Sequence, residues 1–551
     1  MFGLLLALAG VDWFVIPPLS NIPRLPDAVP ADGVRGGSLG VIACRDEFEP
    51  ASFELVSDRD LEGVALEASD LRADGGAIIP KSKVDLKVVK VWYQCGNSWY
   101  TYFCDPGLKL CPDLLLNDEN LIRVDEKKKA NFVRVRYDGK EDYVWVSPPT
   151  VIDPGFRKWT EPVDDAETLQ PFALEKGRYK QFFATFRIDR DAKPGLYRGS
   201  VRIKDREGGL LGEIPVRLRV MKHVLPAPKT YYDLNADFYT MLYMPGADCD
   251  DAKLRKRLQN WYDHNVRNPL YFGLGSEYKG LARTEKGLAM AKEIGMQLDP
   301  FFEAWFCARG ATAEFFCRRK REGEIANREL GRILGHHNLY VAGGEEPPPW
   351  RVVESRNGWR IAHEEGNLVM CNGRDRRHYC GYSDDFRIGS GFMDREQADF
   401  MHRIRGKIGN YAGPHTGPEN PDYMRRMSGL NLYKKDCDMM YNYCYVEGQW
   451  NDLKSGCWRI TLVYETRGGY IDTLPWEGVR EGIDDIRYAT LLMQLADRAV
   501  KEGKQKNVDR YYAGRKALQF LANLNEERCD LPAARLEILN HIDRLDAVLA
   551  K

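Results

Sequence analysis

Two adjacent glutamates, Glu345 and Glu346, stand in the run Gly343-Gly-Glu-Glu-Pro-Pro-Pro-Trp350. They directly follow an apolar segment, residues 339–342, that has the composition of a β-strand. Two neighbouring carboxyl groups can share acid and base work when their surroundings set their pKa values apart. Glycine permits a sharp backbone turn, so both side chains could reach one site despite the alternation of a regular strand. A solvated acidic loop is the alternative that the spacing leaves open.

The elements around this pair alternate between strand-like and helix-like segments. The strand-like segments lie at residues 231–235, 268–272, 298–302, 339–342, 367–370, 385–388, 408–411 and 439–443. This number and rhythm predict a (β/α)8 TIM-like barrel, in which catalytic groups stand at the C-terminal ends of the strands. Glu345 and Glu346 follow the fourth of these segments.

The chain before the predicted barrel has a different pattern of apolar and polar residues. Short alternating runs such as Val84–Trp92 are separated by Gly, Pro and Asp turns without a helical period, which predicts an all-β sandwich. The proline-stiffened stretch Val224–Lys229 suggests a domain exit. We therefore predict a β-sandwich domain over 30–228, a catalytic barrel over 229–476, and a helical C-terminal segment over 477–551 packed on the barrel.

The first residues, Met1–Gly10, are apolar and place small residues at Ala7 and Ala9. This pattern predicts a truncated signal peptide within a lead-in over residues 1–29, and therefore export to the periplasm or the cell exterior. A buried first strand is the alternative, and with it a cytoplasmic location. No other apolar run approaches the ~20 residues that a membrane-spanning helix needs.

Composition narrows the classes of partner. Lys plus Arg total 80 and Asp plus Glu total 81, a balance that favours neither a nucleic acid nor an anionic membrane surface. The 13 cysteines include no Cys-x-x-Cys pair, and His336-His337 has no second ligand motif nearby. The sequence thus predicts no metal site and no cofactor, and it leaves the oligomeric state open.

Aromatic side chains are plentiful, with 28 Tyr and 12 Trp. Flat rings can stack on the apolar faces of sugars, although packing in large cores is the alternative role. The candidate substrate contacts follow predicted strands or the acidic pair: Trp305, Trp350, Tyr411, His415, Glu419, Tyr441, Tyr443 and Trp450. We expect one of Tyr441 and Tyr443 to face the barrel and the other to face the helices. A hydrogen-bonded loop residue is the alternative for His415.

One motif is specific enough to suggest a family. The run Pro475-Trp-Glu-Gly-Val-Arg-Glu-Gly-Ile-Asp-Asp485 resembles the closing motif of the catalytic domain of glycoside hydrolase family 123. Matching pieces are Val224-Leu-Pro, the acidic pair with Pro347, and the segment from Tyr411 to Pro421. The resemblance spans about residues 30–500, with the β domain first and the barrel second.

The resemblance implies a glycan or glycoconjugate substrate and no cofactor. Exo-acting members of the family remove β-linked N-acetylgalactosamine by substrate-assisted hydrolysis, in which the acetamido oxygen of the sugar attacks C1. The acidic pair of the family is Asp-Glu, so Glu346 would be the general acid/base and Glu345 would orient the acetamido group. Glu345 departs from the family's Asp, and its extra methylene moves a carboxylate by ~1 Å. This departure concerns the 2-acetamido specificity more than hydrolysis.

Two rival functions stay open. One is a retaining glycosidase that uses a protein nucleophile on a sugar without the acetamido group, and the other is a non-catalytic glycan-binding protein. The charged residues of the closing motif, Arg480, Glu481 and Asp484-Asp485, fall at the start of a predicted helix. There they would be mainly architectural, with acids complementing the helix dipole and Arg480 paired with Glu477 or Glu481.

Overall fold

The computed structural model describes residues 10–96, 105–137, 139–146, 162–242, 249–271, 279–303, 324, 328–344, 349–373, 385–389, 394–410, 420–446, 450, 461–503 and 507–550. Contacts divide the chain into two units. Unit 1 contains residues 1–225, 416–423 and 448–478, and unit 2 contains residues 226–415, 424–447 and 479–551. The domain boundaries predicted from the sequence stay predictions.

Unit 1 is built from β-sheets. The first two have the strand orders β2-β1-β4-β14-β8-β9 and β13-β5-β15-β16-β3, with β6 and β7 at the margin of the second, and a third has the order β10-β11-β12. The bounds are β1 Val11–Ile16, β2 Val34–Arg35, β3 Leu39–Arg45, β4 Glu47–Ser57, β5 Leu61–Ala68, β6 Leu71–Ala73, β7 Ile78–Ile79, β8 Val84–Gly96, β9 Asp105–Leu116, β10 Ile122–Asp125, β11 Ala130–Tyr137, β12 Lys140–Trp145, β13 Phe172–Leu174, β14 Lys180–Ile188, β15 Gly195–Lys204 and β16 Leu210–Val224. A short antiparallel pair, β25 Val463–Glu465 and β26 Tyr470–Asp472, also belongs to unit 1.

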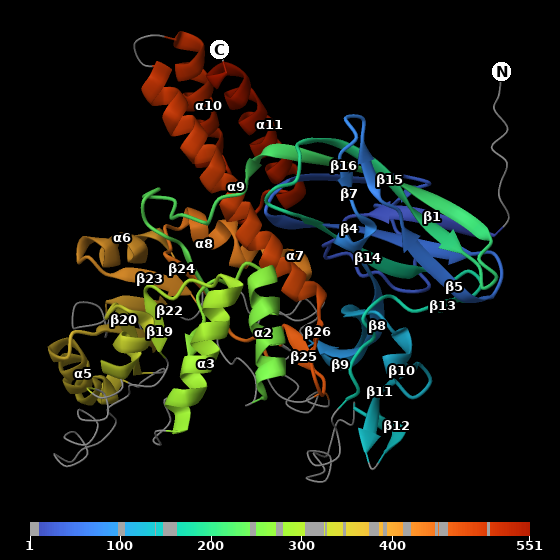
Figure 1. Cartoon of the computed structure of the whole chain (residues 1–551), viewed down its shortest axis with the longest axis horizontal. Coiled ribbons are helices and arrows are strands. Elements are labelled where there is room, and N and C mark those ends of the chain that lie inside the picture. The colour runs from blue at the N-terminus through green and yellow to red at the C-terminus, as the bar shows by residue number, and fades with distance from the viewer. Residues whose placement is uncertain are drawn as a thin grey trace. The chain divides into compact units, whose positions relative to one another are not determined.

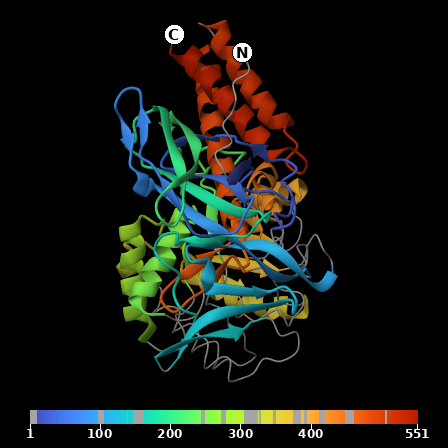
Figure 2. The same ribbon diagram turned by 90° about the vertical axis from the view of Figure 1, so that its right-hand side faces the viewer.

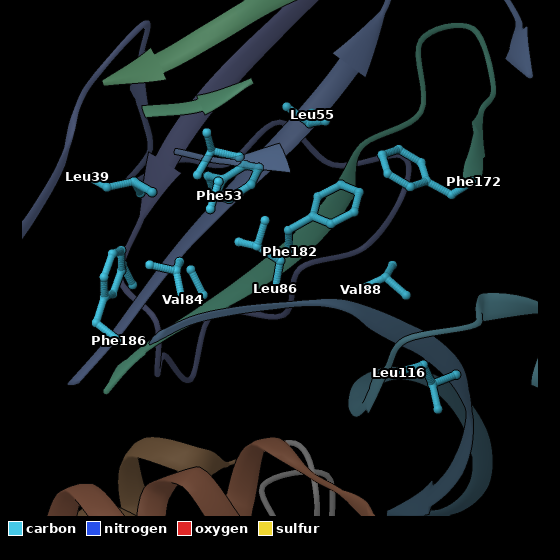
Figure 3. Packing of buried hydrophobic residues seen from close by; sticks show 14 of the residues in the cluster. Leu39, Phe53, Leu55, Val84, Leu86, Val88, Leu116, Phe172, Phe182 and Phe186 are labelled. Carbon is cyan, nitrogen blue, oxygen red and sulfur yellow. The ribbon is translucent and has the colours of Figure 1, made fainter. Parts of the chain in front are cut away.

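The two large sheets share one hydrophobic core (Figure 3), as in sandwich-type packing. Its centre is aromatic: Phe53 of β4 and Phe182 of β14 are register partners whose rings stack at 5.5 Å, and Phe172 lies 4.7 Å from Phe182. Period-two alternation places Phe53 and Phe182 on one face of the first sheet, and Phe172 meets them from β13 of the second sheet. Burial of such large apolar areas stabilises the unit.

A carboxyl group is buried on the opposite face of β4. Glu54 is 1% exposed and burial raises its pKa to about 7, although Arg24 opposes the shift. The pKa in the folded protein therefore exceeds the usual 4.5, and the folded state holds a proton that the unfolded chain releases between these values. Stability consequently falls as pH rises from 4.5 to 7.

We expect Glu54→Gln to raise the free energy of unfolding by about 3 kcal/mol at pH 8 and to leave it nearly unchanged at pH 4. Urea unfolding at both pH values measures this difference. Glu62→Gln, at an exposed position of β5, is the matched control and should change neither value by more than about 0.5 kcal/mol. A destabilised Glu54→Gln protein at pH 8 would contradict the assignment.

Unit 2 contains an eight-stranded, all-parallel sheet with the order β17-β24-β23-β22-β21-β20-β19-β18. Its strands are β17 Tyr239–Leu242, β18 Leu270–Tyr271, β19 Phe301–Glu303, β20 Leu339–Gly344, β21 Leu368–Gly373, β22 Phe386–Gly389, β23 Lys407–Asn410 and β24 Met439–Asn442. Consecutive strands are neighbours and the first strand pairs with the last, so the sheet curls with the strand order of a (β/α)8 barrel.

A closed barrel, which the sequence predicted, is not shown by the described residues. No backbone ladder joins β17 to β18 within the part of the chain that the structure describes. At this seam β18 is two residues long, and the side chain of Asn268 takes over the pairing. The side-chain Oδ1 of Asn268 accepts from the backbone N–H of Thr240 (3.0 Å), and the backbone N–H of Asn268 donates to the carbonyl of Thr240 (3.1 Å).

One predicted strand was wrong. Residues 231–235 form a turn, and the first strand of unit 2 is β17 instead. Asp233 causes the turn because its Oδ1 accepts from the backbone N–H of Asn235 (2.9 Å) while its carbonyl accepts from Oγ1 of Thr230 (2.8 Å). Such local side-chain bonds compete with strand formation.

The α-helices in the described part of the chain are α2 Asp251–Asp263, α3 Lys279–Ile294, α5 Pro349–Glu364, α6 Arg395–Arg403, α7 Pro421–Ser428, α8 Leu430–Lys434, α9 Leu474–Gly503, α10 Val508–Asn523 and α11 Leu531–Leu549. Six of them begin after a residue whose side chain accepts a hydrogen bond from a backbone N–H of the first turn: Asp250, Asp394, Asn420, Thr473, Asn507 and Asp530. The helices α10 and α11 pack against each other in both views (Figures 1 and 2). None of the described helices is long and apolar enough to cross a membrane.

Two aspartates tie the N-terminal edge of the parallel sheet. Asp438, just before β24, accepts from the backbone N–H of Ile408 in β23 (2.9 Å) and lies 2.9 Å from Nε2 of His402 in α6. Asp385, just before β22, accepts from the backbone N–H of Val369 in β21 (2.7 Å) and contacts a histidine of α5. Each carboxylate thus links two neighbouring strands and a covering helix.

Candidate active site

The C-terminal end of β20 is irregular. Its register with β21 shifts between Ala342 and Gly344, so Gly343 is an extra residue in the ladder. A side chain at Gly343 would not fit, because a Cβ there would lie 2.4 Å from Nε1 of Trp359 and 2.5 Å from a methyl group of Val369. The Trp359 ring of α5 also donates to the Gly343 carbonyl at 2.6 Å. A bulge of this kind redirects the residues that follow it.

The predicted catalytic pair follows this bulge directly. Glu345 and Glu346 lie outside the described residues, which resume at Pro349, the first residue of α5. The strand that precedes them in the sequence, β20, is flanked by β19 and β21 in the parallel sheet. Because the bulge interrupts the alternation of β20, strand period alone does not decide which carboxylate faces the interior.

The inner face of the curled sheet carries an aromatic cluster. Its buried members are Tyr239, Met241, Phe302, Tyr340, Met370, Met439 and Tyr441. Phe302 and Tyr340 stack at 5.1 Å, and Tyr239 meets Phe302 edge-on at 5.4 Å. Burial raises the pKa of Tyr239 to about 12 and raises that of Tyr340 further, so both phenols stay protonated in the physiological range.

This cluster corrects one expectation. Tyr441 is 1% exposed within the cluster, and the half-buried Tyr443 packs against it from the end of β24. Both therefore lie on the inner side, whereas the sequence analysis expected them on opposite sides. Residues two apart on a strand share a face, so the expectation conflicted with strand geometry from the start. The sequence analysis also missed Tyr239 and Tyr340, which the same period-two pattern could have found.

Most other predicted substrate contacts fall beyond what is described. Trp305, Tyr411, His415 and Glu419 lie outside the described residues, in segments that follow β19 and β23. Trp350 lies in the first turn of α5, where the structure describes the backbone alone. Their roles stay predictions.

Trp450 is part of the core of unit 1. It is 6% exposed, its ring lies 5.0 Å from that of Tyr464 and 6.1 Å from that of Trp92, and its Nε1 donates to the carbonyl of Glu465 at 2.6 Å. This packing suits a core residue rather than a stacking platform for a sugar ring. We do not include Trp450 in the function proposed below.

The closing motif lies at the start of α9, and its charged residues are buried. Asp485 accepts two hydrogen bonds from Arg425 of α7 (2.8 Å each) and one from Arg535 of α11 (2.7 Å). Arg535 also donates to Oε2 of Glu481 at 2.6 Å. Although burial opposes ionisation, Arg425 and Arg535 hold the pKa of Asp485 below its usual value. The expected pairing of Arg480 with Glu481 is present, at 3.7 Å.

A glycine of the motif permits this network. A Cβ at Gly482 would lie 2.4 Å from the carbonyl oxygen of Arg425, and one at Gly429 would lie 2.5 Å from the carbonyl oxygen of Gly482. The backbone of α9 therefore touches the end of α7, which brings Arg425 against Asp485. The segment 411–419, which holds three predicted substrate contacts, leads along the chain into α7. The motif thus acts as a support for that helix.

The whole chain shares its fold with a glycoside hydrolase. The match is to a family 123 glycoside hydrolase from Clostridium perfringens, whose structure was determined to explain glycolipid glycan hydrolysis, with a TM-score of 0.63 and 11% identity over 98% of this chain and 100% of that chain. A β-glucuronidase from Parabacteroides merdae (TM-score 0.31, 9% identity, 85% and 68% coverage) and a D-psicose 3-epimerase from Clostridium cellulolyticum (TM-score 0.30, 9% identity, 45% and 98% coverage) are too distant in structure to support an inference. No protein-family profile matches the sequence, and no curated protein matches it.

Proposed function

We propose that this chain, which has the fold of a family 123 glycoside hydrolase over its full length, is a glycosidase of the exo-acting β-N-acetylhexosaminidase type. The observation that carries the proposal is the shared fold together with an acidic pair at the bulged end of β20. In barrels of parallel strands this edge is where catalytic groups gather. The proposed substrate is a glycan or glycoconjugate that ends in a β-linked N-acetylgalactosamine.

The proposed reaction proceeds in two steps. First, the 2-acetamido oxygen of the sugar attacks C1 while the bond from C1 to the glycosidic oxygen breaks, and Glu346 gives its proton to that oxygen. Glu345 accepts from the acetamido N–H and stabilises the oxazolinium-like intermediate. Water then attacks C1 while Glu346 takes a proton from it, and the bond between C1 and the acetamido oxygen breaks and restores the acetamido group, so the product keeps the β configuration. No nucleophile from the protein is needed.

The aromatic cluster on the inner face of the parallel sheet also supports the proposal. It would form the bottom of a substrate site at the C-terminal ends of the strands. Tyr443 is half-buried above the cluster of unit 2, and its ring could pack on the apolar face of a sugar. Tyr441 is buried within the cluster and would form part of the bottom of the site. The other substrate contacts predicted from the sequence, Trp305, Trp350, Tyr411, His415 and Glu419, complete the proposed site.

Glu345 also favours a second candidate function. In a retaining glycosidase that acts on a sugar without the acetamido group, a carboxylate attacks C1 itself, and the longer Glu reaches further than the family's Asp. The leaving group would again be protonated by Glu346.

A panel of aryl glycosides distinguishes these possibilities. We expect the purified protein to release the aryl group from a β-N-acetylgalactosaminide about 100-fold or more faster than from the matching β-galactoside, because the acetamido group supplies the nucleophile. A thiazoline mimic of the intermediate should inhibit the reaction. The reverse preference, with a mass shift on one carboxylate after treatment with a 2-fluoro glycoside, would support the second candidate. Oligosaccharide binding without turnover across the panel would show a glycan-binding protein instead.

A further inference from the structure

A cavity lies in unit 1, on elements far along the chain from the acidic pair. It has a volume of about 450 Å³, within the range of small-molecule sites. Strands β8, β10, β13 and β14 and the segments between them supply its walls. Its charged lining residues include Lys90, Glu119, Glu126, Arg178 and Lys180.

Most of these charges neutralise one another. Nζ of Lys180 lies 2.6 Å from Oε2 of Glu119 and donates to the carbonyl of Ala173 at 2.6 Å. Arg178 contacts Glu126 at 2.5 Å and Glu175 at 3.2 Å. These pairs fix the shape of the cavity, and they leave little charge for a ligand.

Lys90 differs from Lys180 and Arg178, which are paired with carboxylates, and from Arg123, an exposed lining residue that stacks on the ring of Tyr143 at 3.6 Å. The Nζ of Lys90 donates to the backbone carbonyl of Glu119 at 3.1 Å, and within the described ranges of the chain no carboxylate lies within 4.0 Å of it. Burial lowers its pKa to about 8, so the amine still carries its proton at neutral pH. A half-buried ammonium can donate three hydrogen bonds, so Lys90 has donor capacity left toward the cavity.

The remaining walls are apolar with a polar rim. Val91, Ile122 and Leu174 contribute aliphatic surface, and Tyr179 contributes an aromatic ring. Asn120 and Glu126 are exposed at the rim, where they can bond to hydroxyl groups. A sugar ring combines an apolar face with peripheral hydroxyls, and this division matches the cavity.

We propose that this cavity is a second binding site for a sugar that carries one negative charge, with the anionic group on Lys90 and the ring against the apolar walls. The shared chemistry is a singly charged acidic sugar, which a carboxylate (a uronic or sialic acid) or a sulfate ester can provide. Lys180 and Arg178 are already paired with carboxylates, and Arg123 stacks on the ring of Tyr143, so we assign the anionic group to Lys90.

Calorimetric titration of the full chain tests this proposal without reference to hydrolysis. The probes are sodium glucuronate, N-acetylneuraminate and galactose 6-sulfate, with galactose as the neutral control. We expect at least one charged probe to bind about tenfold or more tightly than galactose, and the preferred probe identifies the anionic group. Lys90→Met keeps the aliphatic stem and should lose this preference.

Lys128→Met is the matched control, since Lys128 is an exposed lysine of unit 1 that does not line the cavity, and it should bind as the unaltered protein does. Thermal unfolding checks that both variants fold. Equal binding of charged and neutral probes by the unaltered protein would overturn the proposal even if Lys90→Met failed to fold. So would an unchanged preference in folded Lys90→Met. Loss of glycosidase activity in Glu346→Gln should leave probe binding unaltered, which separates this site from the proposed active site.

Discussion

Glu346→Gln is expected to lower kcat/KM on a 4-nitrophenyl β-N-acetylgalactosaminide by about 100-fold or more, because general acid catalysis contributes ~10²–10⁴ to such rates. The amide keeps the shape of the carboxyl group and cannot transfer a proton. The loss should shrink on a 2,4-dinitrophenyl glycoside, since its aglycone leaves as a stable anion without protonation. Steady-state kinetics on the two substrates measure both effects.

Two variants complete this test. Glu345→Gln should lose activity on both substrates to a similar degree, because the carboxylate that orients the acetamido group acts whatever the leaving group. Glu364→Gln changes an exposed glutamate at the far end of α5 and should retain full activity. Full activity of Glu346→Gln would remove the central residue assignment, and an equal loss on both aglycones would give Glu346 a role other than acid.

Asp485→Asn is expected to lower the free energy of unfolding by about 3–5 kcal/mol, because it leaves the buried guanidinium of Arg425 without its carboxylate and removes one of the two carboxylates that bind Arg535. Arg425 and Arg535 are each 5% exposed, so water cannot replace the lost contacts. The pKa of Asp485 in the folded state is below its usual value. The contribution of the pair is therefore present above the unfolded pKa and is lost as pH falls through the lower, folded one. Urea unfolding at neutral pH measures the effect.

Asp497→Asn provides the comparison on the same helix. Asp497 pairs with Lys501 at 2.6 Å near the surface, where an ion pair contributes about 0–1 kcal/mol. If the two variants lost similar free energies of unfolding, the buried Asp485 network would stabilise the protein no more than a surface ion pair does. A folded Asp485→Asn protein with lowered activity would also show that the network supports the site through α7.

The strand order of unit 2 could be predicted because its signal is local. Seven of the eight predicted segments overlap observed strands, since short apolar runs bounded by turn residues are direct evidence of buried strands. The exception, residues 231–235, failed because Asp233 and Thr230 form hydrogen bonds that favour a turn. Between β17 and β18 the side chain of Asn268 takes the place of backbone pairing, and no periodicity in the sequence reveals such a contact.

The candidate site was less predictable than the fold. The acidic pair, chosen by residue type and spacing, stays a prediction, and the bulge at Gly343 depends on the distant Trp359, which a local pattern does not connect with it. Trp450 shows the converse problem, because its position in the core of unit 1 follows from packing on Trp92 and Tyr464. Sequence order suggested a place at the barrel mouth. Both the bulge at Gly343 and the position of Trp450 depend on packing between residues that are not neighbours in the sequence.

A crystal structure with a bound N-acetylgalactosamine-derived thiazoline would show where the sugar lies relative to the acidic pair. We expect the sugar ring at the C-terminal end of β20, with the thiazoline nitrogen within about 3 Å of the Glu345 carboxylate and with Glu346 in reach of the position of the leaving oxygen. A thiazoline bound at another edge of the sheet, or both carboxylates turned toward the outer helices, would contradict this expectation.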